Sequence, residues 1–325
     1  MTIDAQILTE LRAKPDGVSG AELSQQLGIS RAAIWARIEE LRACGYDIEA
    51  SPHQGYRLLS MPDVLHADDL ISRLSPNRIV GRDIRVFQET TSTNDVMERL
   101  ARDGVKEGMV VFAESQTKGR GRLGRVWMSP PGKGLWLSVL LRPNLRPMAV
   151  TQLTIMAATA LTRAIRGVSG IKPEIKWPND ILIKGKKVAG VLTELSAELD
   201  TVKYIILGIG VDVNQSVYEF PPELSAIATS LQIETGRTIP RAELAAALLR
   251  ELDHDYDRIS LGKFEEVADE WEANCHTIGG NVAIRVGDRQ IRGRAESLDA
   301  DGALLLRTQH GHLERIIGGD VTVEK

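Results

Sequence analysis

The segment from Lys118 to Trp127 reads KGRGRLGRVW and combines four cations with three glycines. Glycine lets the backbone approach a ligand closely, and arginine offers a rigid fork of donors to phosphate or carboxylate. The segment therefore predicts an anion-binding loop. With few side chains to bury, such a loop is expected to stay mobile until its ligand binds. On composition alone, a solvated basic loop or a nucleic-acid-binding patch remains an alternative.

Three further polar clusters could act with this loop. The sequence TTSTN at 90–94 follows a predicted strand, where its hydroxyls and amide could bind a small polar ligand or merely cap a helix. In KWPND at 176–180, Asp180 could hold a metal or orient an arginine. Lys187 opens a predicted strand, and Gly190 leaves room for a ligand over the sheet, although a simply solvated lysine is the alternative. The coincidence of these clusters favours one shared site.

The elements that must position these clusters alternate between strand and helix patterns from about residue 64 to 273. A hairpin around Gly185 predicts a mixed sheet with helices packed on it, not a purely parallel doubly wound sheet. Strands are predicted at Asp83–Phe87, Met109–Ala113, Leu135–Leu141, Ile181–Ile183, Val188–Glu194 and Tyr204–Val211, and helices at Asn94–Arg102, Thr151–Arg166, Arg241–Ile259 and Lys263–Asn274.

The first 60 residues predict a small helical unit. Its first helix has an apolar face and ends at the Pro15-Asp16-Gly17 break. Ser19 and Glu22 form a capping box that opens a second helix, which Gly28 ends, and Ser30 caps a third helix. Two short helices joined by a tight turn predict a helix-turn-helix, and the strand patterns at 46–50 and 56–59 predict a two-stranded wing.

If this unit binds DNA, its third helix enters the major groove with Ser30, Arg31 and Trp35 in its first turns, and the wing contacts phosphate. Residues 1–60 hold six Lys/Arg against eight Asp/Glu, which argues against strong DNA binding by a monomer. Dimerisation would compensate by doubling the contacts. A helical protein-interaction module is the alternative.

Composition limits the remaining possibilities. The 325 residues, 43% of them hydrophobic and 26% charged, indicate two or three globular domains. The two cysteines, Cys44 and Cys275, have no metal-ligand spacing and do not suggest a disulfide framework, so apart from the possibility named for Asp180 no metal ligands are predicted. The N-terminus has no apolar leader, and the weakly charged run Met148–Thr162 is too short to cross a bilayer. We therefore expect a cytoplasmic protein without a membrane partner.

The tail, from about Thr277, changes to short alternating strands. The apolar alternation at Val282, Ile284 and Val286 and the later short runs predict a small all-β barrel docked on the middle domain. The chain is thus predicted to be an α+β multidomain protein. Its domains are expected at residues 1–62, 63–275 and 276–325.

Taken together, these motifs resemble those of biotin–protein ligases in order and spacing. The matching motifs are STN at 92–94, GRGRLGRVW at 119–127, KWPND at 176–180, KVAG at 187–190, GIGVDVN at 208–214 and ATSL at 228–231. SRAAIWARIEELR at 30–42 and GYRL at 55–58 extend the resemblance to the bifunctional bacterial biotin ligase/repressors of the BirA type. The resemblance implies a winged helix-turn-helix, a class II synthetase-like central domain and an SH3-like barrel.

The resemblance also implies an activity. The substrates would be biotin and ATP with Mg²⁺, and biotinyl-5′-AMP would pass its biotin to a lysine of the biotin carboxyl carrier protein of acetyl-CoA carboxylase. As a biotin-responsive repressor, the adenylate-bound protein would bind operator DNA as a homodimer. Arg120, Arg122 and Lys187 match catalytic positions. The positions matching those that bind biotin or its adenylate are Ser92, Thr93, Asn94, Gln116, Arg120, Gly121, Arg122 and Lys187.

Three departures from the family pattern are visible. Leu123 stands where many relatives have a second arginine, Asp212 where asparagine is usual, and Ala36 where lysine is common. Ala36 and the excess of acidic over basic residues in the N-terminal unit leave open the alternative that the chain is a biotin ligase whose N-terminal unit has no regulatory role. Two further hypotheses are a lipoate or octanoyl transferase and a non-enzymatic transcription factor that senses a small acid.

Overall fold

The predicted helix ends organise the N-terminal part of the chain. The computed structural model describes residues 1–52, 54–76 and 78–323, and its helices α1 (Ile3–Ala13), α2 (Gly20–Leu27) and α3 (Arg31–Ala43) are those expected. Ser19 accepts from the Glu22 amide and Ser30 from the Ala33 amide, while Gly28 ends α2 at a φ of 67°. The predicted helix-turn-helix is confirmed.

A two-stranded wing follows, formed by the antiparallel strands β1 (Asp47–Ser51) and β2 (Gly55–Ser60). Between these strands, residue 53 lies outside the described residues. The chain divides into two compact units, Met1–Arg78 and Ile79–Lys325, so the first extends beyond the boundary expected at residue 62. The extension contains α4 (Ala67–Ser72), which the sequence pattern did not predict because its six residues are too few to show a helical period.

A buried carboxylate joins α4 to the helical unit. Asp69 is only 2% exposed and accepts hydrogen bonds from Arg12 of α1 and from Arg73. Two guanidinium partners compensate the cost of burying this charge. Leu70 of α4 is also buried, so α4 belongs to the packing of this unit.

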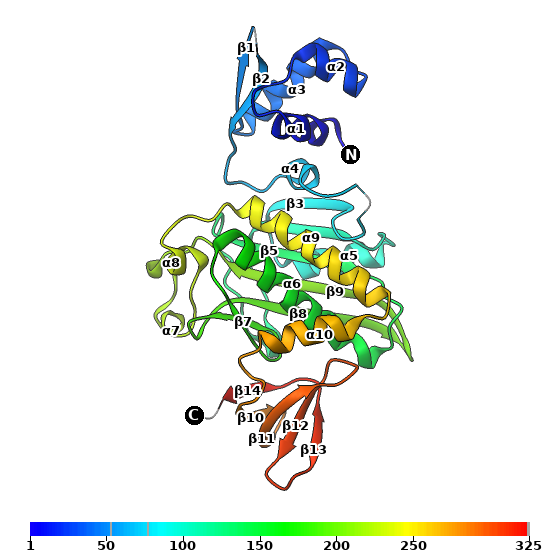
Figure 1. The fold of residues 1–325 in the computed structure, drawn as a ribbon, viewed down its shortest axis with the longest axis vertical. Coiled ribbons are helices and arrows are strands. Elements are labelled where there is room, and N and C mark those ends of the chain that lie inside the picture. Colours follow the sequence, from blue (N-terminus) through cyan, green and yellow to red (C-terminus); the bar gives the residue numbers. More distant parts are fainter. Residues whose placement is uncertain (53, 77, 324–325) are drawn as a thin grey trace. The chain divides into compact units, whose positions relative to one another are not determined.

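The second unit is built on a seven-stranded sheet, and Figure 1 shows helices packed in front of it. Among the described strands of this sheet, β3 and β4 pair in parallel and the other neighbours are antiparallel, so the prediction of a mixed sheet is confirmed. The strand order is β3-β4-β5-β9-β8-β7-β6. The strands are β3 (Asp83–Thr90), β4 (Met109–Gln116), β5 (Gly134–Leu141), β6 (Glu174–Lys176), β7 (Asp180–Ile183), β8 (Lys186–Glu198) and β9 (Thr201–Asp212).

Helices cover both faces of this sheet. The helices α6 (Thr151–Ser169), α9 (Arg241–Ser260) and α10 (Phe264–Ala273) pack together in front of it in Figure 1, and Thr154 of α6 meets Thr193 of β8 at 2.7 Å. The other face carries α5 (Thr93–Arg102), whose Met97 packs in a cluster with Tyr204 and Ile206 of β9. Two short helices, α7 (Pro222–Ser225) and α8 (Leu231–Thr235), follow β9.

The apolar helix α6 is part of the protein core. The helical stretch Pro147–Ser169 extends beyond the run Met148–Thr162 and is, by length and composition alone, long and apolar enough to cross a membrane. Of the most apolar 18-residue window in this stretch, 67% is buried inside the protein. Packing against α9 and the sheet therefore accounts for its composition, since a fully buried helix needs apolar residues on all sides.

The C-terminal part forms a five-stranded antiparallel sheet in the order β13-β12-β11-β10-β14. Its strands are β10 (Asn281–Val286), β11 (Arg289–Leu298), β12 (Leu304–Thr308), β13 (Leu313–Ile316) and β14 (Asp320–Val323). The longest strand, β11, was not predicted, because RQIRGRAESL carries three arginines and a glycine in place of apolar alternation. The last two residues, 324 and 325, lie outside the described part.

Candidate active site

Paired glycines form the floor of the site. Gly190 of β8 lies opposite Gly210 of β9, and Leu192 lies opposite Gly208. A Cβ at Gly210 would lie 2.7 Å from the Trp127 indole, and one at Gly208 would lie 2.4 Å from Asn94 Oδ1. Because side chains from elsewhere rest directly on this backbone, larger residues would displace them. The glycines thus bring Asn94 and Trp127 onto the sheet.

A cavity of about 640 Å³ opens above this floor. Its size falls within the range of small-molecule sites. The cavity is lined by the Gly-Arg loop (residues 118–127), the KWPND segment (residues 176–180), the segment around α7 and part of the C-terminal sheet. It brings together all eight residues predicted to bind biotin or its adenylate, namely Ser92, Thr93, Asn94, Gln116, Arg120, Gly121, Arg122 and Lys187.

The TTSTN cluster is held by side-chain hydrogen bonds. Ser92 occupies the N-cap position of α5 but makes no side-chain capping bond, so simple capping does not explain this residue. Thr93 donates from its amide (2.8 Å) and its hydroxyl (3.2 Å) to Gln116 Oε1. The Ser138 hydroxyl of β5 lies within hydrogen-bonding distance of Thr93 Oγ1 (2.8 Å) and Asn94 Oδ1 (2.5 Å), and its one hydrogen is shared between these two acceptors. Ser138 was not predicted, because one serine within an apolar strand gives no sequence signal.

The Gly-Arg loop folds back on itself as a short hairpin. The Gly121 amide donates to the Arg125 carbonyl at 2.7 Å, and the Trp127 amide donates to the Gly119 carbonyl at 2.9 Å. Leu123 takes a φ of 55° at the tip, where its side chain is exposed. The loop thus lies along one wall of the cavity, while its mobility without ligand stays a prediction.

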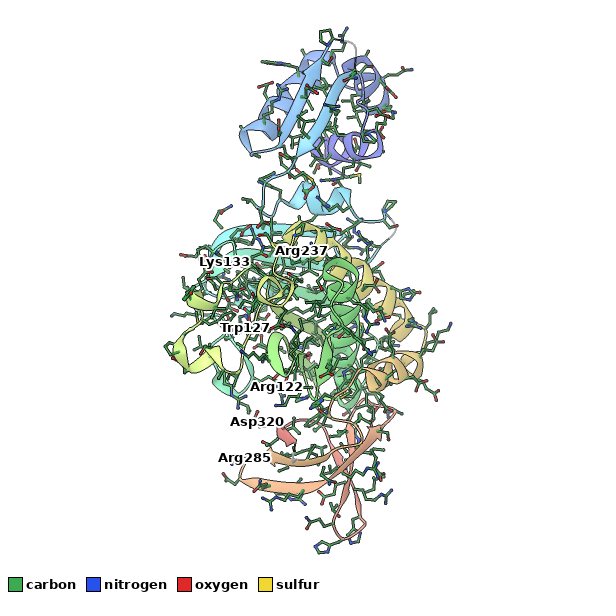
Figure 2. The ribbon with its side chains drawn as sticks, turned by 60° about the vertical axis from the view of Figure 1, so that its left-hand side comes forward. Arg122, Trp127, Lys133, Arg237, Arg285 and Asp320 are labelled. Carbon is green, nitrogen blue, oxygen red and sulfur yellow. The ribbon has the colours of Figure 1, made fainter. Side chains whose placement is uncertain are left out.

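Arg122 connects the loop to two other segments. Its Nη1 donates to Asn179 Oδ1 at 3.0 Å and to the Gly319 carbonyl at 3.5 Å. Figure 2 shows Arg122 near Asp320, which accepts a hydrogen bond from Arg125. Burial lowers the pKa of the Arg122 guanidinium from its usual value. This cation is therefore partly desolvated, which strengthens its interaction with an anion in the cavity.

Lys187 lies at the start of the glycine floor. Its Nζ is 2.6 Å from Asp180 Oδ1 and 5.0 Å from the centre of the Trp127 ring. Asp180 was expected to hold a metal or orient an arginine, but its ion pair is with lysine. The described part of the chain contains no group of three His, Cys, Asp or Glu side chains placed to hold a metal ion. The pair fixes the ammonium at the cavity wall.

Asp212 is an unusual carboxyl group in this cavity. It is 6% exposed, and its Oδ1 accepts from Gln215 Nε2 at 2.5 Å. Burial raises the pKa of Asp212 to about 8. Burial therefore favours the neutral, protonated form of this side chain.

We expect Asp212→Asn to change the pH dependence of stability. A carboxyl group whose pKa is higher in the folded than in the unfolded state lowers stability as pH rises between the two values, here from about 4 to about 8. The asparagine variant should therefore gain unfolding free energy relative to wild type as pH rises through that interval, by on the order of 1 kcal/mol for each pH unit. Chemical unfolding at pH 5, 6.5 and 8 measures this difference.

The matched control is Asp200→Asn, in the exposed turn between β8 and β9. It should follow the wild-type pH dependence. Parallel curves for Asp212→Asn and wild type would contradict a raised pKa at Asp212.

The N-terminal unit presents its own candidate surface on α3. Arg31 and Trp35 lie one helical turn apart, and Trp35 is 58% exposed. The Ser30 hydroxyl caps α3, so one of its hydrogen bonds is already used. Other cations of this unit are paired within it, among them Arg37 with Glu40. Within the described residues, Arg31 makes no ion pair.

Comparisons with known proteins agree with this arrangement. Family models match residues 4–57 (HTH domain), 86–212 (Biotin/lipoate A/B protein ligase family) and 277–323 (Biotin protein ligase C terminal domain). The "Bifunctional ligase/repressor BirA" of Bacillus spizizenii is 39% identical over 95% of each chain. The "Biotin--[acetyl-CoA-carboxylase] ligase" of Paracoccus denitrificans is 33% identical over 70% of this chain and 95% of its own.

A solved structure supports the same relationship. The biotin protein ligase from Aquifex aeolicus, in complex with biotin and ATP, is similar with a TM-score of 0.64 at 32% identity. The similarity covers 75% of this chain and 99% of that chain.

Proposed function

The chain belongs to the family of bifunctional biotin ligase/repressors, and we propose that it activates biotin with ATP and transfers it to a carrier protein. The observation that carries the proposal is the single cavity in which the Gly-Arg loop, the TTSTN cluster and Lys187 meet. That cavity presents cations and neutral hydrogen-bonding groups to one ligand. Such a combination suits a reaction between two anions.

In the first step, a carboxylate oxygen of biotin attacks the α-phosphorus of ATP. The bond to the β-phosphate oxygen breaks, which gives biotinyl-5′-AMP and pyrophosphate. The main barrier is repulsion between the reactants, and Arg120, Arg122 and Lys187 would offset it by stabilising the charge of the transition state. ATP would enter as its Mg²⁺ complex, with the ion held mainly by the phosphates.

In the second step, the ε-amine of a lysine on the carrier attacks the acyl carbon of the adenylate. The carbon–oxygen bond to the phosphate breaks, AMP leaves, and the amine loses a proton to form the amide. Lys187 would polarise the acyl carbonyl. The relative from Paracoccus denitrificans is named for acetyl-CoA carboxylase, which makes the biotin carboxyl carrier protein of that enzyme the acceptor we propose.

The test is incubation of the full chain with biotin, MgATP and a biotin carboxyl carrier domain. We expect pyrophosphate release that depends on biotin, followed by a mass increase of the carrier equal to one biotinyl group. Omission of biotin and replacement of the acceptor lysine are the controls. Absence of both signals would refute the proposed ligase activity.

We further propose that the N-terminal unit binds operator DNA of biotin synthesis genes as a biotin-responsive repressor. The exposed pair Arg31 and Trp35 on α3 supports a contact in the major groove. The adenylate-bound protein would act as a homodimer, because two units would double the contacts of a weakly charged surface. Sedimentation with and without biotin and ATP tests that dimer.

Arg31→Ala is expected to weaken specific operator binding by about 1–3 kcal/mol, because a guanidinium that contacts a base edge is lost. Gel-shift titration at fixed salt, with biotin and ATP present, measures the effect. Arg37→Ala is the matched control, since its side chain on the same helix is paired with Glu40. An equal loss in both variants would contradict a specific contact by Arg31.

The competing hypotheses make different predictions in the same experiments. A ligase without a regulatory N-terminal unit would modify the carrier but show no operator binding. A lipoate or octanoyl transferase would use a different acyl group. A non-enzymatic sensor would release no pyrophosphate. The match of the bifunctional relative over 95% of the chain favours the ligase/repressor, and we expect it to act in the cytoplasm without a membrane partner.

A further inference from the structure

Glu194 of β8 contacts two of the residues that we place in the ligand site. Its Oε2 accepts from Asn94 Nδ2 at 2.7 Å and from Arg120 Nη2 at 3.1 Å. Asn94 lies on the glycine floor, whereas Arg120 belongs to the Gly-Arg loop. A single carboxylate oxygen therefore joins the rigid base of the cavity to its loop.

The same interactions form a chain that reaches both ends of the loop. Arg120, near the start, is held by Glu194 and by Asp95 Oδ1 at 3.0 Å. Ser129, just after the loop, accepts from Gln116 Nε2 at 2.8 Å. Between them the chain runs through Thr93, Ser138 and Asn94. Glu194 is the member that connects this buried network to a loop cation.

On the basis of the proposed ligase function, we propose that Glu194 is a positioning residue that orients Arg120 and Asn94 together for binding the acid substrate and forming its adenylate. Glu194 does not line the cavity, whereas both of its partners do. It also lies on a neighbouring groove that shares Arg120. Glu194 therefore acts through Arg120 from the side away from the ligand.

The hydrogen-bonding pattern of Arg120 supports this role. The nitrogen Nη2 donates a hydrogen bond to Glu194, and the same nitrogen forms an ion pair with Asp95. In the described residues no bond is made by Nε or Nη1, so these donors remain for a ligand. A guanidinium is planar, so a hydrogen bond and an ion pair at one nitrogen limit the directions in which the other nitrogens point.

A purely stabilising role is a poor explanation for this pair. The side chains of Arg120 and Glu194 are 41% and 37% exposed. Ion pairs at such exposure contribute little to stability, because water and salt screen them. Loss of Glu194 should therefore change the melting temperature by no more than about 3 °C, while affecting the geometry of the site.

The test compares Glu194→Ala and Glu194→Gln with Glu198→Ala. Glu198 is the matched control, because it lies four residues further along β8 and pairs with Lys203 outside the cavity. The kcat/KM for biotin-dependent pyrophosphate release should fall by up to about 100-fold in Glu194→Ala, because misplacing a substrate-positioning group by about 1 Å can cost that much. Glu194→Gln, which keeps an acceptor for Asn94, should recover part of that loss, and Glu198→Ala should match wild type.

A double-mutant cycle separates positioning from an unrelated structural effect. In the absence of Glu194, Arg120→Ala should add little further loss, because the arginine is no longer oriented. Fully multiplicative losses, or a Glu194→Ala variant with wild-type kinetics, would overturn the proposal. If either of these outcomes is found while the wild-type protein still releases pyrophosphate in a biotin-dependent manner, the ligase function stands and only the role of Glu194 fails.

Limited proteolysis provides a readout that needs no activity. Trypsin cleaves after lysine and arginine, so Lys118, Arg120, Arg122 and Arg125 report the accessibility of the loop. We expect cleavage in this segment to be several-fold faster in Glu194→Ala than in Glu198→Ala or wild type. Equal cleavage rates would contradict the anchoring of the loop even if the protein proved not to be a biotin ligase.

Discussion

Replacing Lys187 by methionine is expected to slow adenylate formation by about 10²- to 10³-fold, which corresponds to about 2.7–4 kcal/mol of transition-state stabilisation. The ammonium lies beside the Trp127 ring and is held at 2.6 Å from Asp180. Methionine keeps much of the apolar stem but carries no charge to offset the repulsion between carboxylate and phosphate. Both kcat and kcat/KM for biotin-dependent pyrophosphate release should fall.

Lys186→Met is the matched control for this prediction. Lys186 is the adjacent residue of β8, and its Nζ donates to the Ser225 carbonyl at 3.2 Å without lining the cavity. Successive side chains of a strand point to opposite faces of the sheet, so the two lysines are neighbours in the chain but point in different directions. Equal losses in the two variants would show that a general reduction in positive charge, rather than the placement of Lys187, causes the effect.

Arg122→Gly is expected to lower the rate of adenylate formation by about 10² and to release the adenylate into solution. The first effect follows from the loss of a partly desolvated cation. The second follows because Arg122 bonds to Asn179 and to the Gly319 carbonyl, so its removal breaks the attachment to Asn179 and leaves the loop joined to the C-terminal segment through the Arg125–Asp320 pair. Rapid quench measures the rate, and chromatography of protein and filtrate measures retained adenylate.

The control within the same loop is Leu123→Ala, because the Leu123 side chain is 72% exposed at the tip. This variant should retain the adenylate as wild type does. Retention by Arg122→Gly at the wild-type level would refute its role in holding the product. A lower rate with full retention would limit Arg122 to stabilising the transition state.

Much of the fold could be predicted because its signals are local. Ser19 and Ser30 cap the helices that follow them, and the turn around Gly185 joins β7 to β8. Each of these features depends on residues within a few positions of one another. Where the local signal was weak, as in α4 and the arginine-rich strand β11, the prediction failed, because tertiary packing and strand pairing stabilise these elements instead.

The candidate site shows the same division. The order and spacing of the polar motifs led to Arg120, Arg122, Lys187 and the TTSTN cluster, since these residues stand out in type and neighbourhood. Their partners did not stand out. Ser138 and Glu194 are single polar residues within strands, and the pairing of Asp180 with Lys187 depends on the register of a hairpin.

The sequence alone determined which residues carry charge, where the helices of the N-terminal unit begin, and which family the motifs resemble, because each is encoded by residue type at short range. Tertiary structure alone decided which donor meets which acceptor. Residues 94, 120 and 194 come from a helix, a loop and a strand, and they meet because sheet pairing fixes Glu194 beneath α5 and the loop. Hydrogen bonds act over about 3 Å, so such contacts exist only after the chain has packed.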